Sequence, residues 1–160
     1  MIDSGRALIL VMTWNAGCSA SSDLSPLPSP PQGFAHAYAA PSCAPWDGYA
    51  VSIVLRGDPL DPADSLIEGG DQPQLRVAIY PRDATRLGPR TYRWPRQPEE
   101  ASGARCEGGR CEPARTGWIR IRSIAADSGL RGEIELQLSG GATFRGGFTA
   151  VWRSRKNFCI

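Results

Sequence analysis

Hydrophobic and polar residues alternate along most of the chain from residue 48 onward, with the period of two that is typical of a β-strand with one buried face. The alternation is clearest over residues 49–55 and 75–79, and a short third strand is expected over residues 90–94. No stretch from residue 48 onward shows the 3.6-residue period of an amphipathic helix. The pattern therefore predicts an all-β domain.

The last third of the chain predicts a three-stranded antiparallel meander over residues 116–124, 130–138 and 142–153. Ser-Gly-Gly at residues 139–141 suits a three-residue hairpin loop, which sets the register of the two strands beside it. The expected pairs are Leu138 with Ala142, Leu136 with Phe144, Ile134 with Gly146, Gly132 with Phe148, Glu135 with Arg145 and, in the preceding hairpin, Ile119 with Ile134 and Arg120 with Glu133. This register buries apolar pairs and exposes pairs of opposite charge, which supports it.

We therefore expect residues 43–160 to form a small antiparallel barrel or a tight β-sandwich of six to eight strands, with the meander at its C-terminal end. Glycines inside the strands, such as Gly132 and Gly146, fit a strongly coiled or closing sheet. An immunoglobulin-like sandwich is the alternative, although the Cys-Trp-Cys spacing of that fold is missing.

Residues 1–18 have the layout of an export signal, with Arg6, an apolar run over residues 7–14 and small residues before Cys18. Eight apolar residues span about 12 Å as a helix, whereas the hydrocarbon core of a bilayer is about 30 Å thick. The run is therefore too short for a transmembrane helix.

Ala16-Gly17-Cys18 resembles the lipobox of bacterial lipoproteins, in which the cysteine carries acyl chains such as palmitate and becomes the mature N-terminus. The alternative is an ordinary secretory signal cut after Ala20, which would remove Cys18. Residues 19–42 are rich in Ser, Pro and Ala and are expected to form a tether, which favours acylation. The residue after the cysteine is Ser19 and not the Asp of inner-membrane lipoproteins. The resemblance thus implies the outer membrane of a bacterial cell envelope, with a periplasmic or secreted protein as the alternative.

Removal of Cys18 from the domain leaves four cysteines, namely Cys43, Cys106, Cys111 and Cys159. An even number in an exported chain is typical of disulfides formed in an oxidising compartment. Of the three possible connectivities, we expect Cys106–Cys111, which closes a tight loop containing two glycines, together with Cys43–Cys159. A metal site or a redox pair is the alternative, but C-x4-C is longer than the usual C-x-x-C spacing, and no metal is expected.

Near the C-terminus, residues 117–124 (GWIRIRSI), 130–138 (LRGEIELQL) and 140–150 (GGATFRGGFTA) are followed by Cys159. With the signal, this pattern resembles that of small uncharacterised bacterial lipoproteins that have a C-terminal antiparallel β-domain. The resemblance covers about residues 115–160 and implies a fold and an envelope location, but no activity.

Composition and charge add mainly exclusions. The 160 residues include 18 Lys+Arg and 16 Asp+Glu, so no bulk positive field points to nucleic acid, which we do not expect as a partner. The chain has one histidine, His36, and its clustered carboxylates lie in polar loops over residues 58–71 and 99–100. The sequence therefore predicts no catalytic constellation, no cofactor and no enzyme activity.

The candidate binding surface is basic, since residues 115–160 hold eight positive residues and three acidic ones. In the expected register Trp118, Arg120, Arg122 and Arg145 share an exposed face, which suits an acidic glycan, a lipid headgroup or an envelope protein. The alternative is a solvated strand face whose arginines pair with neighbouring glutamates. We thus expect a cell-envelope lipoprotein with a non-enzymatic structural or binding domain. The alternatives are a calycin-like carrier of a small apolar ligand and a secreted β-domain that binds anionic glycans through this Arg/Trp face.

Overall fold

The structure is a computed structural model that describes residues 25–45, 48–61, 71–81, 87–96, 99–125, 127 and 129–153. Within them the chain forms eight β-strands and no helix. The strands are β1 (His36–Cys43), β2 (Tyr49–Arg56), β3 (Gln74–Ile79), β4 (Thr91–Trp94), β5 (Ala101–Glu107), β6 (Arg110–Ala125), β7 (Gly129–Leu138) and β8 (Thr143–Trp152). The prediction of an all-β domain is confirmed.

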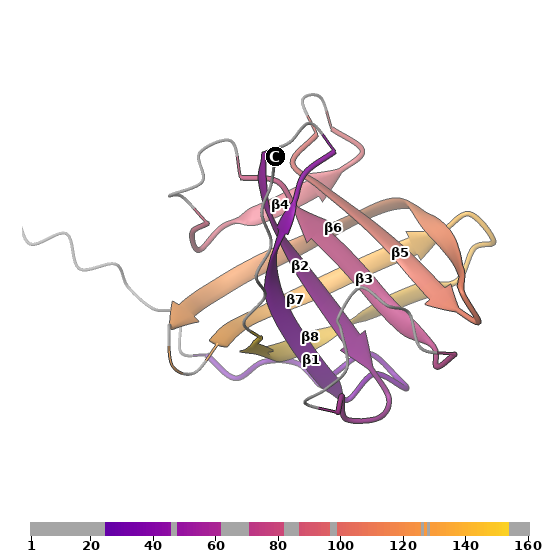
Figure 1. Ribbon diagram of the computed structural model, residues 1–160, viewed down its shortest axis with the longest axis horizontal. Coiled ribbons are helices and arrows are strands. Elements are labelled where there is room, and N and C mark those ends of the chain that lie inside the picture. The colour runs from indigo at the N-terminus through magenta and orange to yellow at the C-terminus, as the bar shows by residue number, and fades with distance from the viewer. Residues whose placement is uncertain are drawn as a thin grey trace, which may run out of the picture.

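The strands form one sheet in the order β4-β6-β5-β3-β2-β1-β8-β7. Because β6 also pairs with β7, seven strands close into a barrel, while β4 pairs with β6 from outside the closed ring (Figure 1). A barrel, and not a sandwich, is therefore the observed form of the predicted fold.

One pairing in the ring differs from the antiparallel expectation. β1 and β8 are parallel, with Ala37 opposite Ala150, whereas the other neighbours in the ring are antiparallel. A ring with an odd number of strands cannot alternate in direction all the way round. The parallel pair is thus a consequence of closing seven strands.

The register predicted for the C-terminal meander is confirmed. Leu136 lies opposite Phe144 and Glu135 opposite Arg145, and in the other hairpin Arg120 lies opposite Glu133. The loop is closed by the Leu138 N–H, which donates to the Ala142 carbonyl oxygen at 2.8 Å. Period-two alternation and a three-residue loop were sufficient to define this part of the sheet.

Strand β1 corrects the expected domain boundary. The composition predicts a tether through residue 42, but residues 36–43 pair along their whole length with β2, and Ala39 and Ala40 are buried. The sequence does not reveal this strand, because both of its faces are covered and its small side chains therefore show no alternation of apolar and polar residues. Ala39 belongs to the main core, while Ala40 packs with Val54 and Leu60 on the outside. The domain therefore begins before Cys43, and residues 19–24 of the predicted tether lie outside the described residues.

Side chains fill the interior of the barrel along most of its length. Buried residues from all eight strands meet there, including Leu75, Tyr92, Ile119, Ile134 and Phe148. This dense packing resembles that of other small barrels whose interior is a core and not a channel.

Trp94 of β4 is accommodated in the core by two glycines. A Cβ added to Gly117 would lie 2.3 Å from the indole ring, and one added to Gly103 would lie 2.7 Å from it. Both positions therefore need glycine for a large aromatic side chain to enter the core beside β5 and β6.

Candidate functional site

The residues predicted as a binding face lie on one outer side of the barrel. β6 carries Trp118 and Arg120, whose neighbours across the ladder are Glu135 and Glu133 of β7. β8 in turn places Arg145 opposite Glu135. The alternation that directs the intervening apolar residues into the core directs these side chains outward.

Arg122 lies on the same side but is largely buried. The register of β6 and β7 shifts between Ile121 and Ser123, and this bulge brings Arg122 onto Glu133. Nε of Arg122 donates to Oε1 of Glu133 at 2.6 Å, and the two side chains are only 12% and 16% exposed. The exposed position expected for Arg122 is therefore corrected, because the bulge makes it part of a shielded ion pair.

A second ion pair on this side is solvated. Nε of Arg145 lies 3.5 Å from Oε2 of Glu135, and the Arg145 side chain is 70% exposed. A pair of this kind contributes little to folding stability because water and salt screen it. Arg145 therefore remains accessible to a partner.

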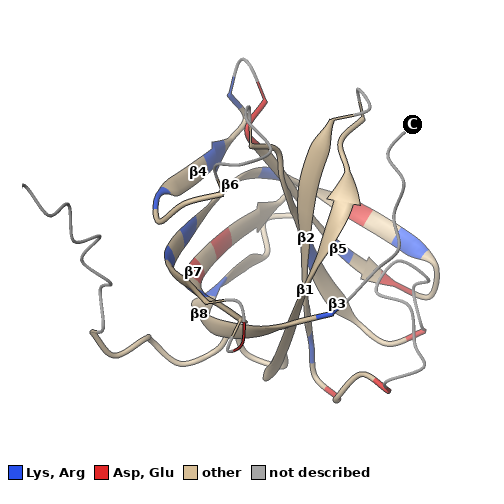
Figure 2. Ribbon diagram, turned by 60° about the vertical axis from the view of Figure 1, so that its left-hand side comes forward, with Lys and Arg blue, Asp and Glu red and all other residues tan. Residues whose placement is uncertain are grey.

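Two further arginines extend this surface. β4 places Arg93 opposite Trp118, and Arg131 of β7 alternates with the buried Gly132 and Leu130. We call the following set the basic face: Arg93, Trp118, Arg120, Arg122, Arg131, Glu133, Glu135 and Arg145. Five arginines face two glutamates there, and Figure 2 shows these basic and acidic positions beside one another on β4, β6 and β7.

Sequence reasoning missed Arg93. Its signal is the alternation of residues 91–94, in which Tyr92 and Trp94 point inward and Arg93 therefore points outward. What the alternation does not reveal is that the short strand pairs with the middle of β6, far away in sequence.

The described N-terminal segment, residues 25–31, reaches this side of the barrel along the edge of β8. The Gly147 N–H donates to the Ser29 carbonyl oxygen at 2.9 Å, and Nη1 of Arg122 donates to the Ser25 carbonyl oxygen at 3.3 Å. Gly147 provides the space, since a Cβ there would lie 2.3 Å from the Pro28 carbonyl oxygen. The chain thus meets the basic face at Ser25.

A pocket of about 740 Å³ lies at one end of the barrel. Its apolar lining includes Phe34 and Phe144, whose rings meet edge to face with centroids 5.5 Å apart. Its polar lining includes Arg105, which donates a hydrogen bond to the Glu107 carboxylate. It also includes Glu112, whose carboxylate accepts a hydrogen bond from the Gly140 N–H at 3.0 Å. This volume lies within the range typical of small-molecule pockets, and the lining combines aromatic and charged side chains.

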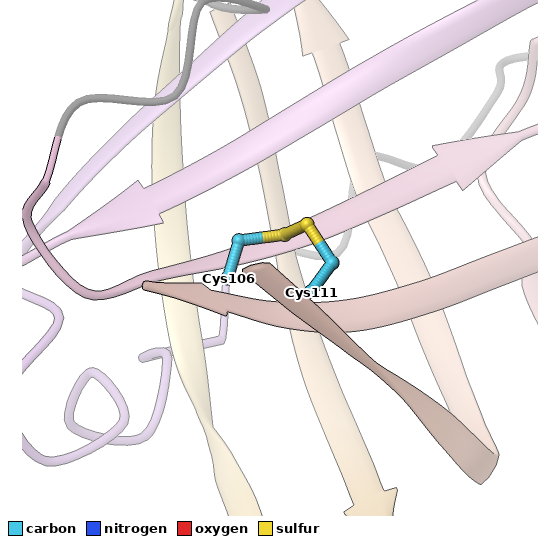
Figure 3. Close-up of a disulfide and its surroundings, with 2 residues drawn as sticks. All are labelled: Cys106 and Cys111. Atoms are coloured by element: carbon cyan, nitrogen blue, oxygen red, sulfur yellow. A yellow bond between two sulfur atoms is a disulfide. The ribbon is translucent and has the colours of Figure 1, made fainter. Parts of the chain in front are cut away.

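The predicted short disulfide is present. Cys106 at the end of β5 and Cys111 at the start of β6 lie opposite each other in the ladder with Cα atoms 4.0 Å apart, and they are joined as Figure 3 shows. Cys43 is also disulfide-bonded. Its expected partner, Cys159, lies outside the described residues, as does the acylation candidate Cys18, so both of these assignments stay predictions.

Among the described residues, no group of three or more His, Cys, Asp or Glu side chains lies close enough to hold a metal ion. His36 begins β1, and Glu100 pairs with Arg96 at 3.6 Å. Within the same part of the chain, no helix has the length and apolarity needed to cross a membrane.

The chain matches no protein-family model, no curated protein sequence and no solved structure.

Proposed function

We propose that this protein is an exported lipoprotein of the bacterial cell envelope, anchored through Cys18, whose barrel binds an anionic partner and catalyses no reaction. The basic face carries this proposal. Five arginines and two glutamates lie on this surface, so its arginines exceed its carboxylates by three charges. A surface of this composition attracts anions over roughly a Debye length, which is about 8 Å at physiological ionic strength.

Export is supported independently by the cysteines. Cys106, Cys111 and Cys43 are disulfide-bonded, and structural disulfides persist in oxidising compartments. The signal-like residues 1–18 and Ser19 after the cysteine add support for acylation and for the outer membrane.

Anchoring is tested by fractionating cells that express the full chain. Globomycin is expected to cause the unprocessed precursor to accumulate, and Cys18→Ala is expected to release the domain from the membrane fraction. Wild-type protein found wholly in the soluble fraction would refute the anchor.

Binding is tested with the full chain carrying Cys18→Ser and two anionic probes, phosphatidylglycerol vesicles and polygalacturonate. Binding to at least one of them is expected to weaken steeply between about 0.05 M and about 0.5 M salt, because exposed charges are screened. Replacement of both Arg93 and Arg120 by Gln is expected to weaken it further. Absence of binding to both probes at low salt would make the face structural.

The pocket favours a second function, the transport of a small amphipathic ligand at the barrel end. The core leaves little room deeper inside, so the ligand would rest on Phe34 and Phe144, with its polar end near Arg105. Native mass spectrometry of the purified protein is expected to show a co-purifying small molecule that Phe144→Ala loses. A spectrum of the bare chain, together with no uptake of an aromatic sulfonate probe, would exclude this function.

A further inference from the structure

The N-terminal segment limits how the barrel can lie relative to a membrane. From Ser25 onward the chain is held on the barrel, through Arg122 at Ser25 and through Gly147 at Ser29. If Cys18 carries the acyl chains, six residues lie between it and Ser25, so the chain from one Cα atom to the other has seven steps. A fully extended chain of that length spans at most about 25 Å.

This reach is shorter than the path around the molecule. A domain of this size is about 35 Å across, so the route over its surface to the opposite side is roughly 55 Å. The side that bears Ser25 must therefore stay near the bilayer. That side is the basic face, because Ser25 lies against Arg122, and Figure 2 shows the N-terminal segment beside the strands that carry the basic positions.

The chemistry of this side matches the surface of an anionic bilayer. Arginines close to such a surface each strengthen association by roughly fivefold, and tryptophan favours the depth of the lipid headgroups. The basic face has five arginines against two glutamates, together with Trp118, which is half-buried between Arg93 and Glu135.

We propose that the basic face of the acylated protein docks onto the anionic phospholipid headgroups of the membrane that holds its anchor. This inference rests on the proposed function, since the orientation depends on acylation of Cys18. Acyl chains and a basic surface then act as two signals, which together fix both the attachment and the orientation of the barrel.

The test uses the acylated full chain in vesicles of phosphatidylglycerol and phosphatidylethanolamine, and phenylglyoxal to modify arginines. Mass spectrometry reports the modification rate of each arginine. Arg145 and Arg96 are a matched pair, with side chains 70% and 57% exposed and carboxylate partners at 3.5 and 3.6 Å. Compared with protein in neutral detergent, Arg145 and Arg93 are expected to react at least roughly fivefold more slowly in vesicles, and Arg96 at an unchanged rate.

Salt separates docking from anchoring. At about 1 M salt the Debye length falls to about 3 Å, so protection of Arg145 is expected to disappear while the acyl chains keep the protein on the vesicles. Vesicle-bound protein in which Arg145 and Arg96 react alike would overturn docking and leave the anchor intact. Protein that is never acylated overturns both proposals. Stronger protection by polygalacturonate than by vesicles would identify an acidic glycan as the partner instead.

A charge-matched pair of variants gives a second measurement that does not depend on modification chemistry. In the full chain with Cys18→Ser, Arg93→Gln with Arg145→Gln is expected to weaken binding to the same vesicles by roughly 20-fold. Arg96→Gln with Arg110→Gln removes the same charge outside the face and is expected to leave binding unchanged. Equal losses in both variants would show a bulk charge effect and would contradict docking.

Discussion

The contact between the N-terminal segment, residues 25–31, and β8 can be tested with Gly147→Ala. The added Cβ would lie 2.3 Å from the Pro28 carbonyl oxygen and 2.9 Å from Cβ of Leu27, so the segment must move away. Residues 25–30 are mostly exposed, and the segment then loses the bond from the Gly147 N–H to Ser29. The expected cost is about 1 kcal/mol, the net value of one such hydrogen bond.

Residues 25–31 belong to no strand, so the segment can detach without unfolding of the barrel. The lost free energy therefore affects this segment and not global stability. The amide at position 147 is expected to exchange with solvent roughly fivefold faster, as measured by NMR, while the melting temperature falls only slightly. Docking of the basic face is expected to weaken too, since the barrel is then held by a longer stretch of chain.

Gly132→Ala is the matched control. Its Cβ would lie 2.3 Å from the Arg120 carbonyl oxygen and 2.8 Å from the Phe148 ring, and both belong to the closed barrel. Neither can move without opening the sheet, so we expect a global loss of about 3 kcal/mol. If Gly147→Ala lowers the melting temperature as much as Gly132→Ala, or leaves exchange at position 147 unchanged, the N-terminal segment does not detach separately from the barrel.

Three further predictions concern stability and are read from urea unfolding. Arg122→Ala leaves the shielded Glu133 carboxylate without its partner and is expected to cost about 2 kcal/mol; a loss below half of that would mean that water replaces the pair. Replacing Cys106 and Cys111 together by Ser is expected to cost about 2 kcal/mol on the chain-entropy model for so short a loop, and no change would contradict it. Burial raises the pKa of Tyr49 above its usual value of about 10. The stability that this pKa difference provides is therefore fully present below about pH 10, the pKa of the unfolded chain, and is lost as the pH rises through the higher pKa of the folded state. Tyr49→Phe is expected to flatten this decline in stability.

The sequence determined the features that depend on neighbouring strands and short loops. The Ser-Gly-Gly loop and the alternation on either side of it are sufficient to pair Leu136 with Phe144, because a slip of one residue would expose every apolar side chain. The short spacing between Cys106 and Cys111 similarly allows a disulfide across one hairpin turn. Such features involve residues that are close in sequence, and their geometry has few alternatives.

The tertiary structure decided what depends on distant contacts. Residues 36–43 carry no alternating pattern, and only β2 on one side and β8 on the other make them a strand. The ladder places Arg120 opposite Glu133, but the bulge after Ile121 brings Arg122 into the ion pair with Glu133.

Assembly of the basic face likewise required contacts between distant parts of the chain. β4 with Arg93 pairs with β6 from outside the closed ring, and Ser25 lies against Arg122, which is 97 positions away in the chain. Period-two patterning states which side of a strand is buried, but it does not state which strands are neighbours. That choice depends on the packing of the whole barrel, and it is the reason the sequence predicted arginines on a face but not their place beside the N-terminal segment.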